Sequence, residues 1–132
     1  MTSEAGVKKY IYDWLVGLDI GRVYQDRMAL NDTTKLQEKR TYVIYDFPEG
    51  IEDQGPWLYG QCTVCIGCRD KKKYIADLAT LDKACSVFKS EFDKNDEAEG
   101  ISCIDVQYID DYPDGAGNHE YQYIFDVYAS KC

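Results

Sequence analysis

Apolar residues recur every three or four positions near the start of the chain, as on one face of an amphipathic helix. Over residues 3–18 these positions are Val7, Tyr10, Ile11, Trp14, Leu15 and Leu18. Ser3 precedes them and is suited to cap the helix, because its hydroxyl can accept a hydrogen bond from an unpaired N–H of the first turn. The pattern predicts a helix over 3–18, followed by a short extended piece around 22–24.

The remaining segments predict a second helix and four strands. The helix is expected over 75–92, with apolar positions at Ile75, Leu78, Leu81, Cys85, Phe88 and Phe92. Segments rich in β-branched and aromatic residues predict strands over 40–47, 57–69, 101–110 and 119–130. The turn-rich stretches 48–56 and 111–118 join them in two hairpins, and the polar stretches 31–39 and 93–100 are expected to be loops.

This order, α-(β)-β-β-α-β-β, predicts an α+β fold. We expect an antiparallel four-stranded sheet, built from two hairpins, with two helices packed on one face. The length of 132 residues indicates a single domain over 1–132.

The charge balance restricts the classes of partner. The chain has 15 basic and 24 acidic residues, a formal net charge of -9. Direct binding of DNA phosphates is disfavoured, because that binding depends on cationic side chains. No apolar run is long enough for a membrane span, and the N-terminus lacks the pattern of a secretory signal, so we expect no membrane association and reduced thiols.

Three of the six cysteines lie in QCTVCIGCRD, residues 61–70, at C-x2-C-x2-C spacing. A zinc or iron–sulfur site would need a further matched ligand pair or a fourth cysteine before proline, and the chain offers neither. In an extended strand Cys62 and Cys68 face one side and Cys65 the other, so they pack as small apolar groups. The alternative is a small cysteine-based metal-binding or redox protein using Cys62, Cys65 and Cys68.

Other candidate chemistry is weak. His119 is the single histidine and has no serine or cysteine partner in a recognisable motif. Acidic pairs such as Asp110–Asp111 arise freely in a chain with 24 acids, and the glycines of 111–118 are turn residues outside any phosphate-binding context. We therefore predict no enzyme activity, no catalytic residue, no cofactor and no metal site.

Several segments carry a resemblance to a known family. RVYQDR (22–27), TYVIYDF (41–47) with LYGQCTVCIGCRD (58–70), TLDKACSVF (80–88) and the last hairpin follow in an order that resembles the tail terminator and tail-completion proteins of tailed bacteriophages. The resemblance covers nearly the whole chain. It rests on the order and texture of the elements, and it brings no active-site residues with it.

The resemblance implies a structural virion protein. Such subunits form a homo-oligomeric ring, a hexamer or a dodecamer, at the head–tail junction (neck or tail terminator), between connector or portal and tail proteins. Genome DNA would pass through the lumen without specific binding, and a net charge of -9 suits a lumen that repels DNA. The protein would be located in the virion tail or neck after assembly in the host cytoplasm.

Aromatic residues near the predicted strand ends are candidates for contact between subunits, because tyrosine and tryptophan are favoured at contact hot spots. Ordinary packing within the sheet is the other interpretation. The candidates are Trp57, Tyr59, Tyr121, Tyr123 and Tyr128.

Overall fold

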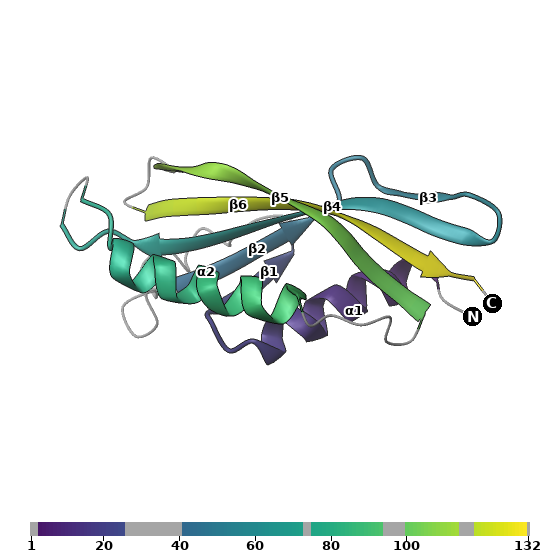
Figure 1. The fold of residues 1–132 in the computed structure, drawn as a ribbon, viewed down its shortest axis with the longest axis horizontal. Helices are drawn as coiled ribbons and strands as arrows, with labels where there is room; N and C mark the ends of the chain where they lie inside the picture. The colour runs from purple at the N-terminus through teal and green to yellow at the C-terminus, as the bar shows by residue number, and fades with distance from the viewer. Residues whose placement is uncertain (1–2, 26–40, 73–74, 94–99, 114–117, 132) are drawn as a thin grey trace.

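The protein is a two-layer α+β structure, with one twisted sheet and both helices on the same face of it (Figure 1). The computed structural model describes residues 3–25, 41–72, 75–93, 100–113 and 118–131, with the backbone alone at 93 and 110–113. The expected α+β class with a mostly antiparallel sheet is confirmed. The elements are α1 (Glu4–Gly17), β1 (Arg22–Gln25), β2 (Thr41–Asp46), β3 (Ile51–Asp53), β4 (Trp57–Arg69), α2 (Leu78–Asp93), β5 (Ile101–Pro113) and β6 (Asn118–Ser130).

Over the described residues the sheet has six strands rather than the expected four. Its order is β1-β2-β4-β6-β5, and β3 pairs with β4 beside the end of β2. The short extended piece at 22–25 is a full member, and it runs parallel to β2, whereas all other pairs are antiparallel. The prediction of an antiparallel four-stranded sheet was therefore wrong in strand number, and the added strand β1 brings one parallel pair into a mostly antiparallel sheet.

The connection expected over 48–56 contains β3, which the sequence pattern did not predict. Gly50 and Gly55 on either side of it adopt positive φ, a conformation that glycine allows at little cost. The chain turns at each glycine, so Ile51 comes to lie opposite Gly60 of β4. Pairing with a strong neighbouring strand thus orders a segment that is too short and polar to show strand periodicity.

A capping residue precedes the first turn of each described helix. The Ser3 hydroxyl accepts a hydrogen bond from the Gly6 N–H at 3.1 Å, as predicted. The second helix begins at Leu78 and not at 75, because the buried Asp77 carboxylate accepts bonds from the Thr80 N–H and hydroxyl at 3.3 and 2.9 Å. Of the expected loops, 31–39 and most of 93–100 lie outside the described residues, while 111–113 belong to β5 and 118 belongs to β6.

The core lies between the helices and the sheet. Even-numbered side chains of β4 face the helices and odd-numbered ones face the opposite side, which we call the outer face. Trp14 of α1 contacts Phe88 and Phe92 of α2 with ring centroids 5.6 and 6.1 Å apart. It also packs edge-on against Phe125 of β6 at 6.2 Å, so one aromatic cluster joins both helices to the sheet.

Candidate functional site

The three clustered cysteines lie on β4, on two different faces of the sheet. Cys62 and Cys68 are buried against the helices, and Cys65 is half-buried on the outer face. Burial raises the pKa of the Cys62 thiol well above its usual value, so this sulfur stays protonated and is a poor metal ligand and nucleophile. The alternation expected from the sequence is confirmed, and the three thiols do not converge on one point.

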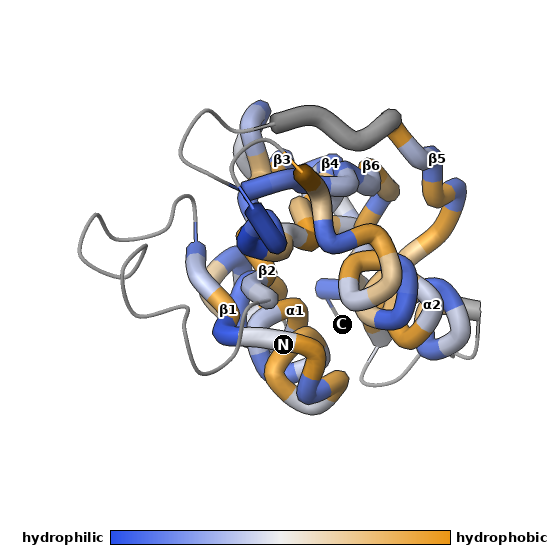
Figure 2. Tube along the Cα trace, turned by 90° about the vertical axis from the view of Figure 1, so that its left-hand side faces the viewer, coloured by the Kyte–Doolittle hydropathy of each residue, from blue (hydrophilic) through white to orange (hydrophobic). Residues whose placement is uncertain are grey.

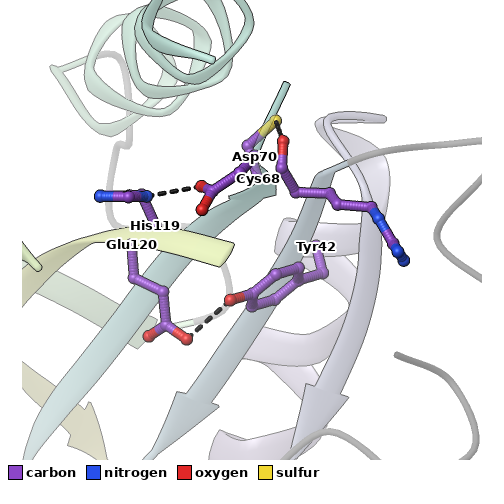
Figure 3. Close-up of polar contacts among 6 residues, drawn as sticks. Tyr42, Cys68, Asp70, His119 and Glu120 are labelled. Carbon is purple, nitrogen blue, oxygen red and sulfur yellow. Dashed lines mark hydrogen bonds and ion pairs between the residues drawn. The ribbon is translucent and has the colours of Figure 1, made fainter. Parts of the chain in front are cut away.

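His119 is positioned by an acidic partner rather than by a thiol. Its Nδ1 lies 2.5 Å from Oδ1 of Asp70, and the two side chains are only 15% and 6% exposed. Cys68 is the ladder partner of His119, yet its sulfur donates to the Arg69 carbonyl at 3.4 Å (Figure 3). The pair joins the end of β4 to the start of β6. Within the described residues, no three metal-ligating side chains gather at one point.

A second buried polar contact ties three strands together on the outer face. The hydroxyl of Tyr42 on β2 donates to Oε1 of Glu120 on β6 at 2.7 Å (Figure 3). Both residues are ladder partners of Gly67 on β4, which lies between them. A Cβ at Gly67 would lie 2.1 Å from Tyr42 Cζ, so the tyrosine ring requires a glycine beneath it. This contact fixes strand register and leaves no reactive group exposed.

The strongest candidate for function is the edge strand β5. Among the described residues it pairs with β6 alone, so its other side ends the sheet. The ladder shifts register between Ile104 and Gln107, where Asp105 adopts a φ of 57°. Large apolar side chains remain exposed along this strand, although protein edges are usually protected by charges or by very short strands. They are Ile104 (43%), Val106 (39%), Tyr108 (47%) and Ile109 (42%).

A hollow of about 260 Å³ lies between β5 and α2, which we call the β5 hollow. Lys89 stands at its rim, with Nζ 5.5 Å from the centre of the Tyr108 ring and 5.9 Å from that of Tyr123. An apolar hollow with a cationic rim, next to an open strand edge, is suited to another polypeptide. Its lining residues are Phe88, Lys89, Phe92, Val106, Tyr108 and Tyr123.

The five aromatic residues selected from the sequence lie in different environments. Trp57 is exposed at the start of β4. Tyr59 donates to Asp126 at 2.7 Å and packs on Tyr128 with centroids 4.9 Å apart; this hydrogen bond raises the pKa of Tyr59 to about 12. Tyr121 donates to Asp82 of α2 at 3.1 Å.

Tyr123 differs from the other four aromatic candidates. It is 1% exposed and packs against Phe88 at 4.8 Å, so its ring belongs to the core of this chain. A contact role for all five candidates stays a prediction, and Tyr123 also lines the β5 hollow. The structure does not bring the five residues together in one surface.

The aromatic candidates chosen from the sequence lie on β4 and β6, and none of them lies on β5. A signal was present in ISCIDVQYID, where apolar residues occupy both faces of the strand instead of one. Such a strand is either buried on both faces or is left with apolar groups exposed, and its place at the edge of the sheet decides between these outcomes. No protein-family model and no curated protein matches the sequence. Neither described helix has the length and apolar character that a membrane crossing requires.

Proposed function

We propose that the protein is a structural virion subunit that assembles into a ring at the head–tail junction of a tailed bacteriophage. The observation that carries this proposal is the exposed apolar edge of β5, together with the β5 hollow beside it. Exposed apolar patches next to unpaired strand edges are typical of surfaces that other polypeptides cover. The proposed ring is a hexamer or dodecamer of this chain, in contact with connector or portal and tail proteins.

The charge of the chain supports the passage of DNA rather than its capture. With 24 acidic against 15 basic residues the chain repels phosphates overall, so a lumen lined by such subunits would let DNA slide through. We therefore expect the assembled protein to give no shift of duplex DNA in an electrophoretic mobility assay at moderate salt.

Light scattering on the full-length chain, coupled to size-exclusion chromatography, tests the assembly. We expect a concentration-dependent increase from the monomer mass to one closed oligomer, with rings visible by negative-stain electron microscopy. A monomer at the highest soluble concentration, unchanged when connector and tail proteins are added, would overturn the proposal.

A matched pair of variants identifies the surface. Ile109→Lys places a charge on the exposed edge of β5 and should prevent assembly without lowering the melting temperature. Ile75→Lys makes the same change at a 55% exposed isoleucine outside β5 and should assemble like the wild type. Equal assembly of the two variants would exclude the β5 edge from the contact.

A further inference from the structure

The described sheet has two ends, and they differ in character. β5 forms one end and β1 the other, with α1 beneath the β1 end and α2 beneath the β5 end (Figure 2). A ring of identical subunits needs two different, complementary surfaces on each copy. The two ends of this sheet are candidates for such a pair.

The strand directions fit this pairing. β1 runs parallel to β2, and each later step across the sheet to β4, β6 and β5 reverses direction. β1 therefore runs antiparallel to β5 in the same chain. Around a ring whose axis follows the strands, all copies share the same strand direction. β1 of one copy then meets β5 of the next in an antiparallel pair, which is more stable than a parallel pair.

The charges favour this pairing over pairing of two β5 strands. Arg22 is exposed on β1 and is the ladder partner of Tyr42, which places it on the outer face. Asp105 is exposed on β5 and lines an outer-face depression with Gln61 and Asp126. Two β5 edges would bring Asp105 of both copies into one contact, and neighbouring like charges destabilise a strand pair. A β1 edge brings an arginine to the same face instead.

The helix layer offers a second complementary contact. Around the axis of a helix each residue is turned by about 100° from the one before it. Ile11 faces the sheet. Measured from Ile11, Tyr12 therefore lies about 100° to one side and Trp14 about 60° to the opposite side. Trp14 contacts α2, so Tyr12 and Val16, which are 43% and 47% exposed, lie on the flank of α1 that faces away from α2. That flank would meet the β5 hollow of the neighbouring copy.

We propose that the occupant of the β5 edge is β1 of a second copy of this chain, with Arg22 paired to Asp105 and with Tyr12 and Val16 seated at the β5 hollow near Lys89. The inference rests on the proposed ring assembly and specifies its contact. The sheet of each subunit then continues into the sheet of the next one. Such a contact uses different surfaces on its two sides, so every copy contributes both.

Charge reversal on the full-length chain tests this contact. Arg22→Glu and Asp105→Lys should each raise the concentration needed for assembly by about tenfold or more, because each places like charges together at the contact. A 1:1 mixture of the two variants should assemble again. In an alternating ring the introduced lysine of one copy meets the introduced glutamate of the next, and every other contact keeps the wild-type pair.

Controls separate this effect from misfolding and from net charge. Glu52→Lys and Lys71→Glu change the charge by the same amounts at other exposed positions and should assemble like the wild type. Asp105→Asn keeps a residue that tolerates positive φ and should weaken assembly by a smaller factor, without loss of melting temperature.

Each outcome decides a separate point. If wild-type rings form and Arg22→Glu forms rings at the same concentration, β1 is not the partner of β5. The proposed β1–β5 contact is then wrong, and the proposed ring assembly stands. Failure of the 1:1 mixture to assemble, with both variants folded, overturns the pairing of these two residues. If the wild-type protein stays monomeric, both the proposed ring and the proposed β1–β5 contact are wrong.

Discussion

β4 and β5 are both 13 residues long, both are rich in apolar residues and both carry cysteine, yet they have opposite roles. β4 pairs with β2 and β3 on one side and with β6 on the other, whereas β5 pairs with β6 alone among the described residues. In β4 every even-numbered position is buried, whereas the odd-numbered ones range from exposed to buried, with Thr63 and Gly67 buried as well. In β5 the side chains beyond Cys103 are exposed on both faces as far as Ile109.

The difference shows that the position of a strand in the sheet decides what its apolar residues do. In β4 they form the centre of the core, where a neighbour on each side and a helix above remove them from water. In β5 the same residue types are left for a partner, and the register shift at Asp105 marks where the edge departs from a regular ladder. The first strand specifies the fold, and the second is available for assembly.

An isoleucine-to-alanine pair tests the comparison most directly. Ile66→Ala on β4 removes a fully buried side chain and should lower the free energy of unfolding by about 3 kcal/mol, because a cavity replaces it. Ile109→Ala on β5 should cost less than about 1 kcal/mol, since 42% of that side chain is already exposed. Urea unfolding at a concentration where the protein is monomeric measures both. Similar losses in the two variants would contradict the division of roles.

A glycine pair tests the cross-strand contact that fixes β4. Gly67→Ala places a methyl group in the ring of Tyr42, so the ring must move away from Glu120 and leave that buried carboxylate without its phenol. The expected loss is about 2–3 kcal/mol, from the lost buried hydrogen bond and the strain of displacing the ring. Gly17→Ala is the control, because nothing lies within 4 Å of its new methyl and alanine favours helices. Thermal unfolding should show a loss for the first variant only.

Local signals in the sequence predicted most of the fold. The 57–69 strand was predicted with the bounds observed for β4, and the Ser3 cap and the separation of Cys62 from Cys65 are confirmed. These features depend on neighbouring residues and on the two-residue period of a strand. β3 was missed because it is too short and polar to show strand periodicity, and the parallel pairing of β1 was missed because local alternation does not contain strand order.

The candidate surface was harder to predict than the fold. Tyr123 and Trp57 were both chosen because they are aromatic. Tyr123 lies in the core, whereas Trp57 is exposed at a strand end. Exposure depends on which strand ends the sheet, and strand order is a long-range property that the alternation of residues does not contain. The unusual feature that a sequence can reveal is a strand such as 101–109 with apolar residues on both faces.

The smallest expected effect concerns the outer face where β4 meets β6, at the Tyr59–Asp126 hydrogen bond. This bond raises the pKa of Tyr59 to about 12, whereas a tyrosine in the unfolded chain has a pKa of about 10. Between these pH values the unfolded chain loses the proton that the folded chain retains, so the stabilisation is complete below about pH 10 and is lost as the pH rises to about 12. The ring is only half-buried, so solvent limits the effect to about 1 kcal/mol.

Urea unfolding between pH 9 and 12 measures this contribution. Tyr59→Phe removes the ionising hydroxyl, and Asp126→Asn keeps the hydroxyl but removes the carboxylate that holds its proton. Both variants should lose less stability than the wild type over this range, because neither has a proton retained only in the folded state. A wild-type slope in both would mean that the bond across β4 and β6 does not hold this proton. In that case the packing of Tyr59 on Tyr128, and not the hydrogen bond, would fix the outer face beside the edge strand.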